Sequence, residues 1–157
     1  MPHPKTLLLF NYDWDEQGAN RLRTQWPSVV SGFDLFSFPS NARLAWFDTE
    51  RFVAKAAVFA KLHGAKAVAS NHEQFGALCA ALLAEKMGWP GTPVNAILAC
   101  QHKLYARKVL QQVAPEANLP FARLDAAYGG PVPQGIDYPQ FVKPVKAAFS
   151  VLSRQVK

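Results

Sequence analysis

The sequence predicts an α/β fold, in which helices flank a parallel sheet and a smaller region of mixed α+β structure follows. Short apolar runs alternate with segments of helical periodicity over the first half of the chain, which is the pattern of a parallel sheet with helices between its strands. The 157 residues suffice for one complete core. Half of them are apolar and 18% are charged, a balance that supports a buried core and excludes a disordered chain.

The first predicted strand is residues 6–10, a continuous apolar run that ends before Asn11. A continuous run is typical of a strand buried on both faces of a parallel sheet, because a strand with one exposed face alternates apolar and polar residues. The run is far shorter than the ~20 residues of a membrane span, and no small-residue cleavage site follows it. We therefore expect neither a signal peptide nor a membrane anchor.

Residues 33–38 and 65–69 are predicted as the second and third strands, since each is a short apolar run that stops at a turn-forming residue. A helix is predicted between them, over residues 48–63. Its apolar residues fall on one face at helical spacing: Phe52, Ala56, Phe59 and Ala60. Gly64 is placed to end this helix.

The clearest helix covers residues 75–87, and one face of it carries the apolar side chains Phe75, Leu78, Cys79, Leu82, Leu83 and Met87. We expect Asn71 to cap its start and Gln74 to reach back as in a capping box, and we expect Gly88 to end it. Strands and helices together predict a single core, formed by residues 7–9, Leu35, Phe59, Val68, Phe75, Leu78 and Leu82.

A rigid turn at residues 89–93, which contains two prolines, divides the chain. We place the first domain at residues 1–93 and an incomplete second region at residues 94–157. A helix is predicted over roughly residues 96–113, and beyond it prolines and glycines exclude another long helix. Residues 141–144 and 150–156 are predicted to pair as a hairpin. Because two strands alone are marginally stable, we expect their partners to lie outside these residues, in a longer protein.

Basic residues are concentrated in the last third of the chain. Residues 1–100 hold 9 Lys and Arg against 8 Asp and Glu, a net charge of +1, whereas residues 101–157 hold 8 against 3, a net charge of +5. Such a surplus is consistent with the phosphates of a nucleotide or with nucleic acid, and composition does not choose between them. Cys79 and Cys100 form neither a disulfide framework nor a zinc-site spacing, so a reducing, cytoplasmic setting is expected.

Four short motifs follow one another in an order typical of one enzyme family. They are Gly88-Trp89-Pro90-Gly91 after a helix, Gln101-His102-Lys103 at the start of the next, an expected strand at Asn118-Leu119-Pro120-Phe121, and Tyr138-Pro139 leading through a short strand to Lys143-Pro144. No one of these motifs is specific for a family, but their order and spacing together are. In these features the chain resembles the ATP-grasp superfamily, which includes carboxylate-amine ligases and biotin carboxylase-like enzymes.

The resemblance implies a Rossmann-like preATP-grasp domain at residues 1–93 and the start of the ATP-grasp nucleotide-binding lobe at residues 94–157. It also implies an ATP- and Mg²⁺-dependent ligase, which phosphorylates a small-molecule carboxylate so that an amine or another nucleophile can attack it. The metal ligands of that family lie later in the chain, so no metal site is expected within these residues. Alone, they are expected to be inactive. A homodimer through the first domain is a further candidate interaction.

By resemblance, Lys103 would contact nucleotide phosphates, and Lys143 would contact the α-phosphate and the adenine edge. Lys103 begins a helix at the edge of its apolar face, and Lys143 interrupts an apolar strand before a proline, so its ammonium must leave the core or find an anion. The alternative is that both are solvated surface lysines. The glycine-rich loop of many relatives is missing after Lys143. Lys146 and the Ser150 hydroxyl could bind phosphate there, or the segment is a plain hairpin turn.

Candidate substrate-binding residues follow the first and third predicted strands: Asn11, Asn71 and Glu73. Open parallel sheets bind ligands at the carboxyl ends of their strands. The same residues could instead serve as helix caps and first-turn acids. No Gly-x-Gly-x-x-Gly follows the first strand, which counts against a dinucleotide site.

The alternative function is a non-catalytic, basic α/β module that binds nucleic acid or a protein partner. It accounts for the length and the charge without a missing part. Nucleic acid is not the expected partner, because basic and aromatic residues do not alternate along a continuous strip and no recognised nucleic-acid motif is present.

Overall fold

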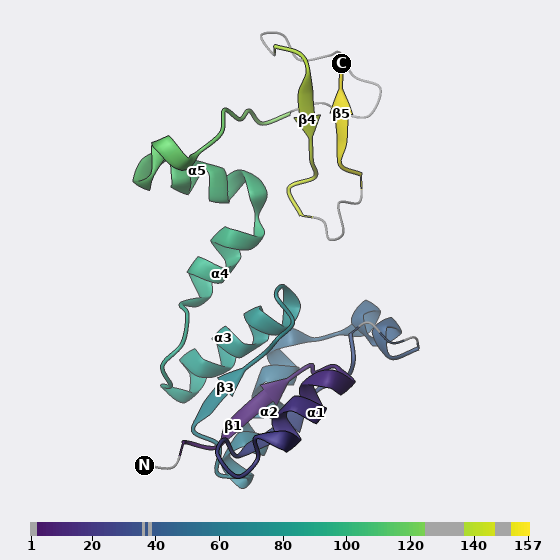
Figure 1. The fold of residues 1–157 in the computed structure, drawn as a ribbon, viewed down its shortest axis with the longest axis vertical. Helices are drawn as coiled ribbons and strands as arrows, with labels where there is room; N and C mark the ends of the chain where they lie inside the picture. The colour runs from purple at the N-terminus through teal and green to yellow at the C-terminus, as the bar shows by residue number, and fades with distance from the viewer. Residues whose placement is uncertain (1–2, 36, 38, 125–136, 147–151) are drawn as a thin grey trace. The chain divides into compact units, whose positions relative to one another are not determined.

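The computed structural model describes residues 3–35, 37, 39–124, 137–146 and 152–157. The chain divides into two compact units, Met1–Ile97 and Leu98–Lys157, whose elements are labelled in Figure 1. The first unit holds a parallel sheet with helices, and the second holds a helix and an antiparallel pair of strands.

The first unit is built on a three-stranded parallel sheet, as the sequence predicts. Its strands are β1 (Thr6–Leu9), β2 (Ser28–Ser31) and β3 (Ala67–Ala69), in the order β2-β1-β3. The register places Leu7 of the central strand opposite Val29 on one side and Val68 on the other. The helices are α1 (Asp13–Arg21), the 3-10 helix η1 (Ser40–Trp46), α2 (Thr49–Leu62) and α3 (Phe75–Met87). The prediction of a Rossmann-like sheet flanked by helices is confirmed.

The second strand lies earlier than predicted, at Ser28–Ser31 rather than at residues 33–38. Two β-branched valines between Pro27 and Gly32 favour this strand, and Gly32 turns the chain with a φ of +106°. Phe33 and Leu35 are core residues instead of strand residues. Residues 36 and 38 lie outside the described part of the chain.

The core of the first unit joins β1 to α2 and α3. Leu7 and Leu9 have no exposed surface and cluster with Ala56, Ala60, Cys79 and Leu83 from the two helices. Of the predicted core residues, Leu7, Leu9 and Leu35 are buried, and Phe59, Val68, Phe75 and Leu82 pack half-buried against them. Leu8 and Leu78 are half-buried and belong neither to the buried cluster nor to the residues packed against it, so their assignment to the core was wrong.

The two glycines predicted to end helices do so, whereas the cap predicted at the start of α3 does not form. The Asp48 carboxylate accepts from the Arg51 N–H at 2.9 Å at the start of α2. At the end of α3, Gly88 adopts a left-handed φ of 66°, and Gly64 does the same after α2. The Asn71 cap of α3 is wrong, because the Asn71 amide donates to Asp15 instead. His72 Nδ1 accepts from Gly76 N–H at 3.3 Å in its place.

The predicted helix over residues 96–113 is in fact two helices, α4 (Val94–Gln101) and α5 (Lys103–Val113). His102 has an extended backbone and its Nδ1 accepts from Tyr105 N–H at 3.2 Å, which caps α5. The Lys103 N–H donates to the Val145 carbonyl at 3.0 Å, whereas a continuous helix would direct it to the carbonyl four residues earlier. These two hydrogen bonds explain the break.

Beyond α5, a 3-10 helix η2 (Pro115–Ala117) is followed by the strands β4 (Gln140–Val142) and β5 (Arg154–Val156). The two strands pair antiparallel, with Phe141 opposite Gln155, which confirms the predicted hairpin pairing. Residues 118–121 form no strand, so the strand expected there is wrong. The Asn118 amide instead binds α5, where it donates to the Arg107 carbonyl at 3.0 Å.

Candidate functional site

The turns that follow β1 and β3 meet at the carboxyl edge of the sheet. The Ser70 hydroxyl donates to the Leu9 carbonyl at 2.8 Å. One Asp15 carboxylate oxygen accepts from the Asn71 amide at 2.9 Å and the other accepts from Tyr12 N–H at 3.1 Å. The structure therefore brings Asn71 to the turn that carries Asn11, two of the three residues proposed for substrate.

Gly76 allows the turn after β3 to stay this tight. A Cβ at Gly76 would overlap the Ser70 hydroxyl and come within 2.9 Å of the His72 Cβ. Because both residues belong to the turn between β3 and α3, a larger side chain would push this turn away from the sheet. Gly76 thus helps to hold Asn71 and Glu73 at the edge.

Asn11 lies beneath this edge and is 8% exposed. Its Nδ2 is buried, and among the described residues it has no hydrogen-bond acceptor. A buried amide donor without an acceptor is uncommon and destabilising. The third proposed residue, Glu73, is exposed in the turn before α3.

Tyr12 and Trp14 form an aromatic stack at the same edge. Their ring centroids are 4.4 Å apart with an angle of 16° between the planes, and Trp14 is 64% exposed. Burial raises the pKa of the Tyr12 phenol above its usual value of 10.0, and the negative charges of Asp34, Asp15 and Glu73 raise it further. Asp15 lies in the first turn of α1, Asp34 follows β2 and Glu73 precedes α3, so the fold brings charges from three separate segments near Tyr12.

Residues 11–15 were expected at this edge from the sequence, although neither Tyr12 nor Trp14 was singled out as a binding residue, and Asp34 was missed. The misplaced second strand hid Asp34, because it put that residue inside the strand rather than after it. With β2 at Ser28–Ser31, Asp34 follows a strand end just as Asn11 and Asn71 do. A search for polar residues after the β-branched run would have found it.

The predicted nucleotide residues lie in the second unit. Lys103 is the first residue of α5 and half-buried. Its N–H bond to Val145 holds the start of α5 to the segment that follows Lys143-Pro144. The two lysine motifs, 40 residues apart in sequence, are therefore joined in the fold.

Lys143 follows β4 instead of lying within it, and its side chain is exposed. Its Nζ lies 5.0 Å from the centroid of the Phe141 ring, a cation–π distance. The prediction that it interrupts the strand was wrong, and the aromatic contact holds its ammonium at the surface. Lys146 is exposed, and Ser150 lies outside the described residues.

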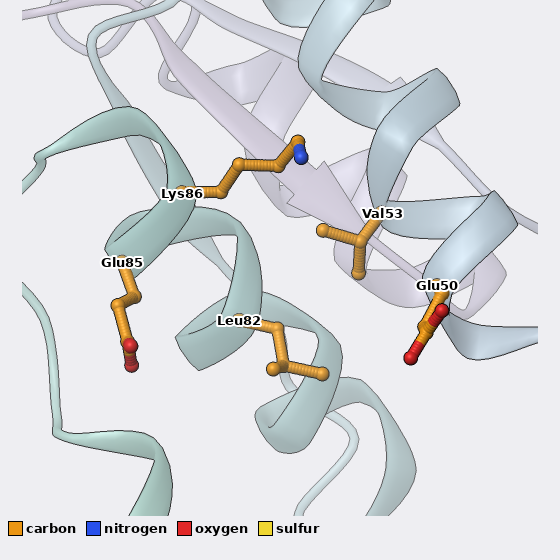
Figure 2. Close-up of a pocket in the computed structure, with 5 residues that line it drawn as sticks. All are labelled: Glu50, Val53, Leu82, Glu85 and Lys86. Atoms are coloured by element: carbon orange, nitrogen blue, oxygen red, sulfur yellow. The ribbon is translucent and has the colours of Figure 1, made fainter.

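A hollow of about 430 Å³ lies between α2 and α3. Figure 2 shows Val53 and Leu82 facing each other across it, with the charged side chains of Glu50, Glu85 and Lys86 around them. Its lining contains none of the predicted site residues.

Among the described residues, no three His, Cys, Asp or Glu side chains lie together as metal ligands would. None of the described helices is long and apolar enough to span a bilayer.

Comparison with known proteins rests on the fold. No protein-family model matches the chain, and no curated protein matches its sequence. Among solved structures, the L-amino acid ligase from Bacillus licheniformis superposes with a TM-score of 0.70 over 99% of this chain. The fold is similar to part of an ATP-grasp ligase. At 17% sequence identity the likeness to this ligase shows the fold alone, and the chain spans 39% of its length.

Proposed function

We propose that these residues are the N-terminal portion of an ATP-dependent ligase. The observation that supports this most is the superposition on an L-amino acid ligase over 99% of the chain. In this proposal residues 1–93 are the preATP-grasp domain and residues 94–157 begin the nucleotide-binding lobe. The protein acts in the cytoplasm, and a homodimer through the first domain is part of the proposal.

The proposed reaction has two steps. A carboxylate oxygen of the small-molecule substrate attacks the γ-phosphorus of ATP, so that a P–O bond forms, the bond to ADP breaks, and an acylphosphate results. An amine or another nucleophile then attacks the acyl carbon and inorganic phosphate leaves with the C–O bonding electrons. The amine gives up a proton, and the product is an amide when the nucleophile is an amine.

Lysines of the second unit would bind the nucleotide. Lys103 stands at the N-terminus of α5, where backbone N–H groups and the helix dipole favour phosphate oxygens. The bond from its N–H to Val145 keeps it beside the segment that contains Lys143 and Lys146. The Phe141 ring, 58% exposed next to Lys143, offers a flat apolar surface on which an adenine could stack.

Mg²⁺ would offset the phosphate charges, but the described residues do not fit a site for it. They contain no group of three metal-ligating side chains. We therefore assign the metal carboxylates to the remainder of a longer protein, and these residues alone should not turn over substrate.

A nucleotide titration tests the proposal. The chain is titrated with a non-hydrolysable ATP analogue and Mg²⁺ and followed by NMR, in the parent and in Lys103→Ala. Lys108→Ala is the control, because Lys108 is an exposed lysine on the same helix. We expect saturable shifts near Lys103 and Lys143, and affinity that falls by roughly 10-fold or more only in Lys103→Ala. Equal losses in both variants, or no saturable shifts, would contradict nucleotide binding here.

The basic surplus beyond residue 100, net +5, favours one other function, a binding module for nucleic acid or an acidic protein. That module would bind single-stranded oligonucleotides with an affinity that falls steeply with salt, and the ATP analogue would not compete. The same NMR titration with an oligonucleotide separates the two functions.

A further inference from the structure

The charges of the first unit nearly cancel in number, but the fold separates them. Residues 1–100 hold 9 Lys and Arg against 8 Asp and Glu. Every acid among them except Glu85 stands where a strand has ended or a helix begins: Asp13, Asp15, Glu16, Asp34, Asp48, Glu50 and Glu73. The opposite edge of the sheet, where the strands begin, is therefore poor in acids.

Five cations gather at this amino edge. α1 and α2 each lead from the end of one parallel strand back to the start of another, so both helices end at this edge. Arg21 is the last residue of α1, and Lys61 lies in the last turn of α2. Arg23 follows α1, and Lys5 and Lys66 come directly before β1 and β3.

Helix dipoles account for only part of this positive charge. Cations stabilise the last turn of a helix, which explains Arg21 and Lys61, and the Lys5 ammonium donates to the His63 carbonyl at the end of α2 at 3.0 Å. Each helix end carries only about half a negative charge. Arg23 and Lys66 are exposed, belong to no helix, and their side chains form no ion pair with the residues that the structure describes. A positive potential therefore remains at the edge and attracts polyanions.

Trp26 lies in the same row as these cations. The Thr6 N–H donates to the Pro27 carbonyl at 2.9 Å on one side of β1. On the other side, the Lys66 N–H donates to the Lys5 carbonyl at 2.8 Å. The starts of the three strands are thus neighbours, about 4.8 Å apart from strand to strand, and Trp26 stands at one end of the row.

The Trp26 ring is fixed and yet half-exposed. Its indole N–H donates to the Thr6 hydroxyl at 2.8 Å, and the residue is 50% exposed. Because this hydrogen bond occupies the only polar atom of the side chain, what remains exposed is the aromatic surface. Proteins that bind single-stranded nucleic acid combine these two features, since bases stack on aromatic rings and cations follow the phosphates.

We propose that the amino edge of the first unit binds single-stranded nucleic acid, with Trp26 as the ring on which a base stacks and with Arg23, Lys66 and Lys5 as the phosphate contacts. The cations come from separate segments of the chain, which is why the sequence shows no basic strip. Stacking tolerates any base, so we expect no strong sequence preference. This inference goes beyond the ligase proposal and does not depend on it.

An oligothymidylate of about ten nucleotides, a typical site size, tests the proposal. It is titrated into the 157-residue chain near pH 7, and the Trp26 indole N–H and the Lys5 and Lys66 amides are followed by NMR. We expect saturable shifts at these positions. The logarithm of the binding constant should fall with the logarithm of the salt concentration, with a slope of roughly −2 to −4 for three to five neutralised phosphates.

Two further probes separate this partner from other anions. Polyphosphate of similar length carries the charge without the bases, so it should bind roughly fivefold or more weakly. Leu22 and Leu62 are exposed at the same edge, which makes an anionic membrane the competing partner. Vesicles that contain phosphatidylserine test it. Equal affinity for polyphosphate, or binding to vesicles without binding to the oligonucleotide, would overturn the inference.

Ring variants test the stacking. Trp26→Leu should weaken oligonucleotide binding roughly fivefold or more, whereas Trp26→Phe keeps an aromatic surface and should lose less. The amide spectrum of the first unit shows whether each variant is folded. Trp26→Leu that is folded and binds like the parent would remove the stacking ring from the proposal and contradict it.

Charge variants at exposed positions test the phosphate contacts and do not depend on the fold of the ring variants. The pair Arg23→Gln and Lys66→Gln should weaken binding roughly threefold or more and reduce the magnitude of the salt slope by about 1 to 2. The control pair is Arg51→Gln and Lys55→Gln, which removes the same charge from exposed positions in the first two turns of α2. It should leave the slope unchanged. Equal effects of both pairs, or shifts confined to residues 98–157, would show that this edge is not the site.

The result is distinguishable from that of the nucleotide titration. The lysines of that titration belong to the second unit, whereas the residues tested here belong to the first. Oligonucleotide shifts absent from the first unit overturn this inference and leave the ligase proposal as it stands.

Discussion

Among single residues, Phe10 is the one around which the aromatic side chains of the first unit pack. It has no exposed surface, and its ring lies 4.7–5.9 Å from four other rings, those of Phe33, Phe47, Phe52 and Phe75. It does so with a φ of 56°, a left-handed conformation that costs a non-glycine residue about 1–2 kcal/mol. The packing of the ring offsets that cost, since fully burying a Phe contributes roughly 1.5–3 kcal/mol.

Gly32 makes room for this ring and gives the first prediction. Its φ is +106°, and a Cβ there would lie 2.9 Å from a Phe10 ring carbon. Gly32→Ala should therefore lower the free energy of unfolding by about 1–3 kcal/mol. Gly18→Ala in α1, where a Cβ meets nothing within 4 Å, should instead raise it by about 0.5–1 kcal/mol. Urea unfolding of both variants measures this, and equal effects would contradict the packing around Phe10.

At the scale of the element, helices were predicted better than strands. α2 and α3 were found within one residue at each end, because each has a continuous apolar face and a local stop signal in Gly64 or Gly88. The strand at residues 33–38 was misplaced because a short apolar run serves equally well as strand or as core loop. The single helix over residues 96–113 was wrong because its break depends on Val145, 42 residues beyond Lys103.

β4 supports a prediction about its two neighbouring lysines. Lys143 is held by the Phe141 ring at 5.0 Å, so its ammonium loses less freedom on binding a phosphate than that of Lys146, which is exposed beyond Pro144. In the full-length protein, Lys143→Ala should weaken binding of an ATP analogue with Mg²⁺ by roughly three- to tenfold more than Lys146→Ala. Calorimetric titration decides it, and a Lys143→Ala variant that binds like the parent would remove this strand from the nucleotide site.

The two units differ in burial at the scale of the whole molecule. The first has a core of buried residues from the sheet, α2 and α3, whereas none of the described residues from 98 to 157 is buried. The sheet of the second unit has two strands, β4 and β5. A two-stranded sheet is only marginally stable unless another layer covers it. We infer that the apolar side chains of this unit find their packing partners in a longer protein.

Hydrogen exchange checks that difference. Backbone amides of β4 and β5 should exchange faster than those of α3, because local opening exposes little apolar surface there and exchange reports the cost of opening. The 157-residue chain is exchanged in D₂O at one pH and followed by NMR. Equal protection in β4 and α3 would mean that the second unit is stable by itself, and the expectation of a longer protein would lose its physical basis.

Local sequence features were enough to predict the α/β class, the two long helices of the first unit, the hairpin pairing and the sheet edge on which Asn11 and Asn71 meet. Each depends on periodicity, stop residues or the alternation of strand and helix, which are local properties. Three features became visible only in the folded chain: Asp34 joins this edge, Asn71 binds Asp15 rather than capping α3, and Lys143 lies outside its strand beside Phe141. These features depend on which distant groups the fold brings within hydrogen-bonding or electrostatic range, and spacing along the chain carries no record of that.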